Sequence, residues 1–168
     1  MSNISIQKIS ITDLDTDAVV NAANSGLHMG GGVCGCIFYR AGINNMSAAC
    51  EKIGHCDTGN AVITPGFKLP AKYVIHAVGP RWRGGENNEP ELLYNAYKNS
   101  LLLAKENGLK SIGFPLISAG IFHYPLEEAW KIAVKSCKDF IAGNPDYDID
   151  IVFAILDDRI IAVGEKLL

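Results

Sequence analysis

Short segments rich in β-branched residues alternate along this chain with longer segments of helical periodicity. The short segments predict strands at residues 4–11, 17–23, 61–64, 73–78, 111–117 and 150–156. The longer segments predict helices at residues 89–108 and 125–143. Strands that alternate with helices favour an α/β fold, in which helices cover both faces of a largely parallel sheet.

Both predicted helices carry boundary signals. Long side chains recur at four-residue steps through Leu93, Tyr97 and Leu101, and Gly108 follows where a helix C-terminal glycine is expected. The second helix is expected to hold Pro125 in its first turn, where acidic residues also favour the positive end of the helix dipole. These signals fix the approximate ends of the two helices.

The size and charge of the chain limit what it can bind. Its 168 residues are 48% hydrophobic and contain no repeat or linker, so we expect one domain over residues 1–168, acting as a monomer. A formal net charge of −3 gives no basic surface for duplex nucleic acid. No apolar stretch approaches the ~20 residues that cross a bilayer, and no signal peptide is visible. We expect a cytoplasmic protein without a membrane partner.

The cysteines indicate thiols rather than disulfides or a metal site. There are five of them, an odd number in a chain too large to depend on disulfides. Cys50, His55 and Cys56 come nearest to a metal cluster, but their spacing lies outside the usual zinc patterns. We expect neither a metal ion nor a cofactor.

A glycine-rich loop follows the strand predicted at 17–23. Gly30, Gly32 and Gly35 have the G-x-G-x-x-G spacing, and the residues after them can begin a helix. Glycines let the backbone approach a phosphate, and the free amides of a helix N-terminus can bind it. The loop is therefore a candidate anion site, with a glycine-rich turn that binds nothing as the simpler alternative.

A dinucleotide-dependent oxidoreductase is a further interpretation of the same spacing. That class places its first glycine in a tight turn directly after the strand, and an acidic residue about 20 positions further on. Here six residues separate Ala23 from Gly30. The acidic candidates Glu51 and Asp57 fall in a predicted helix and loop, so this interpretation is the least favoured one.

A second loop of small residues, 118–125, connects the strand predicted at 111–117 to the following helix. If the two strands are neighbours, their loops form a crevice at the carboxyl ends of the strands, where open α/β sheets bind ligands. Two loops of free backbone amides suit a ligand with two phosphates.

Three stretches of the chain form a specific combination: DAVVNAANSGLHMGGGVCGCIFYRAG, GNAVITPGFKLPAKYVIHAVGPRWRGGENNEPELLYNAYKNSL and FPLISAGIFHYP. Together they resemble the macrodomain family, specifically the bacterial MacroD-type proteins that deacetylate O-acetyl-ADP-ribose and remove mono-ADP-ribose from proteins. The resemblance runs from about Ile4 to Leu168. It implies a three-layer α/β/α fold with a mixed, largely parallel central sheet, and ADP-ribose, an ADP-ribosylated protein or O-acetyl-ADP-ribose as the partner.

The resemblance also implies a set of site residues. Asn24 is expected to bond the distal ribose as a catalytic residue, Gly32 to Cys34 to form the first phosphate loop, and Ser118 to Phe122 to wrap the diphosphate, with the Phe122 ring against the distal ribose. The implied ligand-binding residues are Ser10, Ile11, Asn24, Gly32, Val33, Cys34, Ser118, Ala119, Gly120, Ile121, Phe122 and Leu156.

Three of these positions depart from the family pattern. Cys34 stands where the subfamily usually has a catalytic aspartate, and a thiol is a poor general base at pH 7. Ser10 replaces an aspartate that accepts a hydrogen bond from the adenine amino group, and Leu156 replaces an aromatic ring that stacks on adenine. Each of the two adenine changes is expected to weaken binding by about 1 kcal/mol or more.

These departures leave two main functions open. Backbone amides can stabilise a transition state without a side-chain base, so we expect a weak or altered hydrolase of ADP-ribosyl esters, with Cys34 either a bystander or an unusual participant. The alternative is a non-catalytic module that binds ADP-ribose or a related nucleotide.

Overall fold

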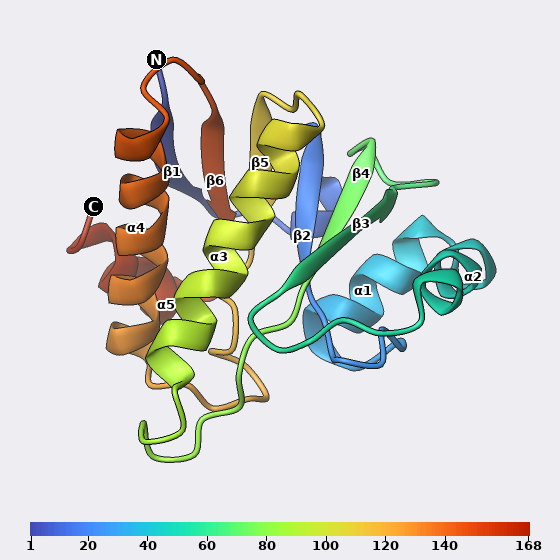
Figure 1. Cartoon of the computed structure of the whole chain (residues 1–168), viewed down its shortest axis with the longest axis horizontal. Helices are drawn as coiled ribbons and strands as arrows, with labels where there is room; N and C mark the ends of the chain where they lie inside the picture. Colours follow the sequence, from blue (N-terminus) through green and yellow to red (C-terminus); the bar gives the residue numbers. More distant parts are fainter.

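The computed structural model describes residues 1–168 and contains a mixed sheet of six strands (Figure 1). The strands lie in the order β1-β6-β5-β2-β4-β3, and every neighbouring pair is parallel except β3 and β4. Their bounds are β1 Asn3–Gln7, β2 Ala18–Ala22, β3 Ala61–Pro65, β4 Tyr73–Ala77, β5 Ser111–Phe114 and β6 Asp150–Ala154. All six predicted strands are confirmed in position, and so is the largely parallel sheet.

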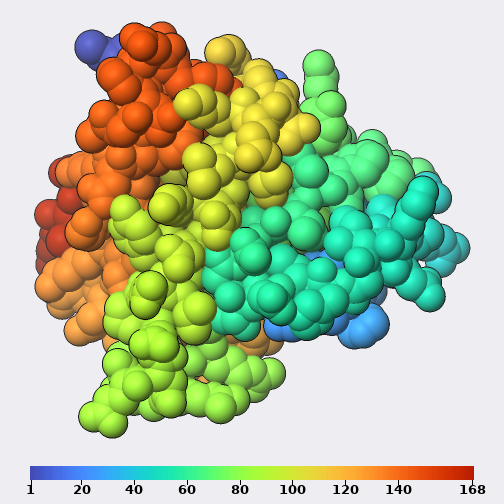
Figure 2. Space-filling view, viewed as in Figure 1, coloured from blue at the N-terminus to red at the C-terminus, as the bar shows by residue number.

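Helices cover both faces of this sheet. Their bounds are η1 Ile11–Asp13 (a short 3-10 helix), α1 Gly32–Ala41, α2 Ile43–Ile53, α3 Glu89–Glu106, α4 Leu126–Gly143 and α5 Asp158–Glu165. Residues of α3, α4 and α5 pack into one hydrophobic cluster and those of η1, α1 and α2 into a second. In Figure 2, α3 and α4 lie in front of the sheet, and the atoms of the β3 and β4 region remain in view beside α3. The three-layer α/β/α architecture is as predicted.

The strands supply both clusters because successive side chains point to opposite faces of a sheet. In β2, Ala18 and Val20 belong to the cluster with α3 and α4, whereas Val19 belongs to the cluster with α1 and α2. In β6, Phe153 and Val152 divide in the same way. A sheet buried on both faces explains why its strands appear in the sequence as nearly continuous apolar runs.

Three strands end two or more residues earlier than predicted. The first ends at Gln7, because the Ser10 hydroxyl accepts from the Thr12 amide at 3.4 Å and begins η1 instead. The fifth ends at Phe114, because Pro115 has no N–H for a strand that is paired on both sides. The sixth ends at Ala154, so Leu156 lies beyond the sheet.

The helix ends are close to those predicted. After α3, Gly108 has a φ of 67°. Its N–H donates to the Lys105 carbonyl, and the Leu109 N–H donates to the Ala104 carbonyl at 2.9 Å. This pair of hydrogen bonds is a Schellman C-cap. At α4 the prediction for Pro125 is off by one position. Its ψ of 131° is extended, so it is the residue before the helix rather than part of the first turn.

Helix α5 was not predicted from the sequence. It begins where the Asp157 carboxylate accepts from the Arg159 N–H at 2.8 Å, and it packs against α4, where Gly164 lies against Trp130. The run Asp157, Asp158, Arg159 is a typical helix start and was the available signal. None of the helices combines the length and apolarity that crossing a bilayer requires.

Candidate functional site

A cavity of about 490 Å³ opens at the carboxyl ends of β2, β5 and β6. Parallel pairing of β2 with β5 brings the glycine-rich loop and the 118–125 loop side by side, as the sequence predicted. Every residue predicted for the ligand site lines this cavity. They are Ser10, Ile11, Asn24, Gly32, Val33, Cys34, Ser118, Ala119, Gly120, Ile121, Phe122 and Leu156.

The glycine-rich loop leads directly into helix α1. Gly31 is the N-cap, and Gly32, with a φ of 56°, is the first helical residue. The first turn packs closely on the loop, since a Cβ on Gly35 would lie 2.6 Å from the Gly30 carbonyl oxygen. Gly32, Val33 and Cys34 line the cavity. The first amides of a helix have no intrahelical partners, so the start of α1 is an arrangement that can bind an anion.

Asn24 holds the loop before the glycines in a closed turn. Its Nδ2 donates to the His28 carbonyl at 2.8 Å, and its Oδ1 accepts from the His28 N–H at 3.0 Å. A carboxamide has two donor hydrogens and two acceptor lone pairs. Asn24 can therefore still offer one hydrogen and one lone pair to a ligand in the cavity.

The Cys34 thiol is engaged with the protein rather than free in the cavity. It is 5% exposed, donates to the His28 carbonyl at 3.5 Å and accepts from Asn21 Nδ2 at 3.5 Å. A sulfur that donates its proton to a carbonyl group is not arranged as a general base. Cys34 instead helps Asn24 to fix the position of His28.

Behind Cys34, a chain of buried polar groups continues into the sheet. The Asn21 carboxamide lies 3.0 Å from Nδ1 of His76, and Nε2 of His76 lies 3.0 Å from the Thr64 hydroxyl. Burial lowers the pKa of His76 to about 4. The imidazole is therefore neutral at pH 7, with Nδ1 accepting from Asn21 and Nε2 donating to Thr64.

The second loop has strained backbone at its start. Ser118 has a φ of 68°, and its carbonyl oxygen accepts from the Tyr124 N–H at 2.9 Å, which closes the loop. Its hydroxyl is buried without a hydrogen-bond partner. A Cβ on Gly79 would overlap this hydroxyl, so the chain after β4 passes close beside it. An unpartnered buried hydroxyl that lines a cavity is available to a ligand.

One end of the cavity is formed by an arginine and an aromatic ring. The Arg81 guanidinium lies 5.0 Å from the centre of the Phe122 ring, and the Trp82 N–H donates to the Phe122 carbonyl at 2.9 Å. These contacts join the 80–83 segment to the 118–125 loop. Arg81 lines the cavity and was not predicted as a site residue.

The opposite end contains Ser10, Ile11 and Leu156. The Ser10 hydroxyl is 2.8 Å from that of Thr12, so it is already used within η1, and Leu156 is 61% exposed. Asp157, which was also missed, lines this end as well. The backbone N–H of Arg159 lowers the pKa of the Asp157 carboxyl, which is charged at neutral pH.

The residues considered for other functions lie elsewhere. Glu51 is on α2 and Asp57 is in the loop that follows, and neither lines the cavity, so the oxidoreductase interpretation gains no support. His55 pairs with Asp57 on the surface at 2.7 Å. No group of three or more His, Cys, Asp or Glu side chains is arranged to hold a metal ion.

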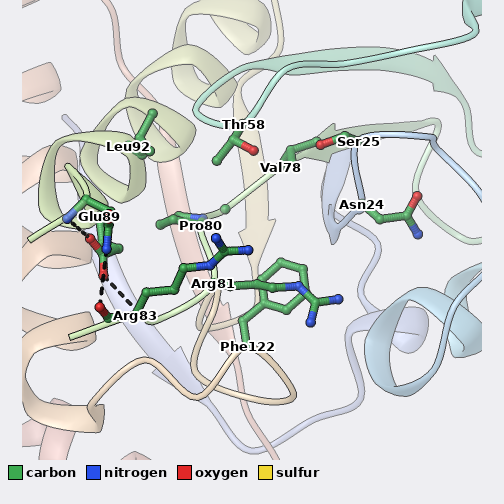
Figure 3. Close-up of a pocket in the computed structure, with 12 residues that line it drawn as sticks. Asn24, Ser25, Thr58, Val78, Pro80, Arg81, Arg83, Glu89, Leu92 and Phe122 are labelled. Carbon is green, nitrogen blue, oxygen red and sulfur yellow. Dashed lines mark hydrogen bonds between the residues drawn. The ribbon is translucent and has the colours of Figure 1, made fainter. Parts of the chain in front are cut away.

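A second cavity, of about 420 Å³, adjoins the first (Figure 3). Asn24, Arg81 and Phe122 line both. In Figure 3, Arg81 extends across the Phe122 ring toward Asn24, and Arg83 directs its guanidinium into the space beside Pro80. The remaining walls come from the segment around Thr58 and from the start of α3.

Comparisons with known proteins agree with this geometry. A family model described as Macro domain matches residues 20–133, a range that includes both loops. An O-acetyl-ADP-ribose deacetylase of Escherichia fergusonii is 52% identical over 147 residues, which are 85% of this chain and 82% of that protein.

Two solved structures share the fold over almost the whole chain. The Oceanobacillus iheyensis macrodomain with ADP has a TM-score of 0.90 at 36% identity, covering 96% of this chain and 87% of that one. The Trypanosoma brucei macrodomain in complex with ADP-ribose has a TM-score of 0.90 at 37% identity, covering 98% of this chain and 68% of that one.

Proposed function

Because this chain belongs to the macrodomain family, we propose that it binds ADP-ribose at the carboxyl ends of β2, β5 and β6 and hydrolyses ADP-ribosyl esters. The ester is either an ADP-ribosylated Asp or Glu side chain of a protein or O-acetyl-ADP-ribose. The structures of similar macrodomains with ADP and with ADP-ribose support the ligand, and the deacetylase relative supports the reaction.

The proposed ligand lies along the cavity with its diphosphate between the two loops. The first amides of α1 and the backbone of residues 118–122 approach the phosphates from opposite sides. The adenine extends toward Ile11 and Leu156, and the distal ribose toward Asn24 and Phe122. The observation that carries this proposal is that one cavity is lined by every predicted residue of both loops.

The proposed reaction uses water and the loops rather than a side-chain base. The water oxygen bonds to the acyl carbon, the bond from that carbon to the ribose oxygen breaks, and the ribose oxygen takes up the proton. Asn24 holds the distal ribose, and backbone amides stabilise the negative charge that develops. Because the Cys34 thiol donates to His28, we propose a slower hydrolase than one with an aspartate at this position.

A non-catalytic binding module is the second candidate. It is favoured by the same observation at Cys34, since the side chain at the usual catalytic position makes hydrogen bonds to Asn21 and His28 of the protein. Under this alternative the cavity binds ADP-ribose as proposed, but no ester is cleaved.

Release of ADP-ribose from a protein modified on Glu or Asp separates the two candidates. The native chain is compared with Asn24→Ala and Cys34→Asp, and Cys36→Asp serves as a control that adds the same charge to α1. Release by the native chain that is lost in Asn24→Ala supports the hydrolase. Absence of release by the native chain, with a gain in Cys34→Asp but not in Cys36→Asp, supports the binding module.

We also propose that residues 1–168 form a single macrodomain that acts as a monomer. One sheet carries both hydrophobic clusters, and strands from both ends of the chain pair with each other through β1 and β6. This arrangement supports one folding unit. Sedimentation of the purified chain measures its oligomeric state.

A further inference from the structure

The second cavity begins at the proposed reaction centre. It shares Asn24, Arg81 and Phe122 with the ADP-ribose cavity, and these residues are at the end proposed for the distal ribose. Any group attached to that ribose therefore leaves the first cavity beside the second. An acetyl group is too small to extend far, whereas a modified protein continues as a peptide chain on both sides of its Asp or Glu.

The charged groups of the second cavity favour an acidic occupant. Arg81 and Arg83 are both exposed and both face the cavity (Figure 3). Neither guanidinium has a carboxylate partner within the chain, since the ion pairs of the structure involve other residues. Both cations are therefore free to pair with a ligand.

The one acidic residue of this cavity does not oppose them. The Glu89 carboxylate is buried at the start of α3 and accepts from the backbone amides of Arg83, Gly85 and Asn87 at 2.9, 2.9 and 2.6 Å. Burial alone would raise the pKa of this carboxyl, but the amides lower it below its ordinary value. The negative charge of Glu89 is thus stabilised by the three backbone amides, and these hydrogen bonds hold the 83–87 segment in place.

We infer that the second cavity binds the peptide chain on which ADP-ribose is carried, and that Arg83, with Arg81, selects peptides with acidic residues beside the modified one. This inference rests on the proposed function, because the peptide reaches the cavity through the bound ADP-ribose. The uncharged groups of Ser25, Thr58 and Asn87 can pair with the peptide backbone. Arg83 is a specificity residue in this arrangement and does not touch the reacting ester.

The test uses two peptides that carry ADP-ribose on one glutamate, flanked by acidic residues in one and by serine and glycine in the other. O-acetyl-ADP-ribose is the substrate without a peptide. We expect the native chain to have a KM about tenfold lower for the acidic peptide than for the neutral one, and the difference to shrink as salt is raised.

The variant Arg83→Glu reverses a charge that is proposed to contact the peptide but not the ADP-ribose. It is expected to abolish the preference for the acidic peptide and to leave the KM for O-acetyl-ADP-ribose unchanged, while Arg83→Lys keeps part of the preference. Lys98→Glu makes the same charge change on the exposed surface of α3, away from the cavity, and should behave as the native chain. Equal KM values for both peptides in the native chain would overturn the inference, as would an equal effect of Arg83→Glu on all three substrates.

Binding titrations separate this inference from the proposed function. The Kd values of ADP-ribose and of both peptides are measured with the same variants, so that the result does not require turnover. A chain that fails to bind ADP-ribose contradicts the proposed function and with it the peptide site. A chain that binds ADP-ribose but binds both peptides equally contradicts only the peptide site.

Discussion

Protonation of His76 in the unfolded chain is expected to lower the stability of the fold between pH 7 and pH 5. The imidazole is fully buried and is bonded to Asn21 and Thr64. The Cys50 thiol lies 3.8 Å from Nε2 of His76, and burial raises the pKa of this thiol to about 11, so it is neutral over this range. Burial lowers the pKa of His76 itself from 6.5 to about 4.

The size of the effect follows from that shift. Because the pKa in the folded chain is below that in the unfolded chain, the unfolded chain binds more protons as the pH falls, and folding becomes less favourable. Each pKa unit corresponds to about 1.36 kcal/mol. The full shift therefore amounts to about 3 kcal/mol, of which about 2 kcal/mol is lost between pH 7 and pH 5.

Urea unfolding at pH 7 and pH 5 measures this loss. The variant His76→Gln keeps a polar side chain at the position but cannot be protonated, so it reports the contribution of all other groups. The free energy of unfolding of the native chain should fall by about 2 kcal/mol more than that of the variant. Equal losses in the two proteins would refute the reasoning, whatever their stabilities at pH 7.

Two further predictions concern the ADP-ribose cavity. Leu156→Phe places a ring at the rim proposed for adenine and should lower the Kd for ADP-ribose about fivefold by calorimetry, corresponding to about 1 kcal/mol of stacking; an unchanged Kd would mean that adenine does not reach this position. Gly35→Ala should lower the free energy of unfolding by about 1–3 kcal/mol in thermal melts, since its Cβ would meet the Gly30 carbonyl at 2.6 Å. Gly31→Ala, whose Cβ meets nothing within 4 Å, is the control, and equal melting temperatures for the two variants would contradict the close contact.

The positions of the strands could be predicted because the sheet is buried on both faces. Runs of Val and Ile such as those of β2 and β6 carry that burial in the local sequence. The strand ends could be predicted less accurately. At Ser10 the side-chain hydroxyl competes with the strand for hydrogen bonds of the backbone, and Pro115 has no N–H to donate to a neighbouring strand. Helix α5 was missed because its eight residues depend on packing against Trp130 as much as on local propensity.

In the site, too, features built from neighbouring residues could be predicted, whereas contacts between distant segments could not. The spacing of Gly30, Gly32 and Gly35 located the first loop, because the loop and the helix start are built from neighbouring residues. Arg81 was not found, since it reaches both cavities from the segment after β4, far in the sequence from the two loops. Asp157 was not found either, although it directly follows Leu156, because no motif in the sequence assigned it a role. The bonds of Cys34 to His28 and Asn21 depend on how the turn closes, which the sequence alone does not state.

The closed turn at Asn24 has an energetic consequence for the ligand. Its two hydrogen bonds to His28 already restrict the loop in the free protein. Fixing the backbone of a residue costs about 1–2 kcal/mol of conformational entropy. Here the loop is already ordered when the chain folds, so this entropy is not lost again on ligand binding. The loop is preorganised, so less of the interaction energy with ADP-ribose is spent on ordering it and more remains as affinity.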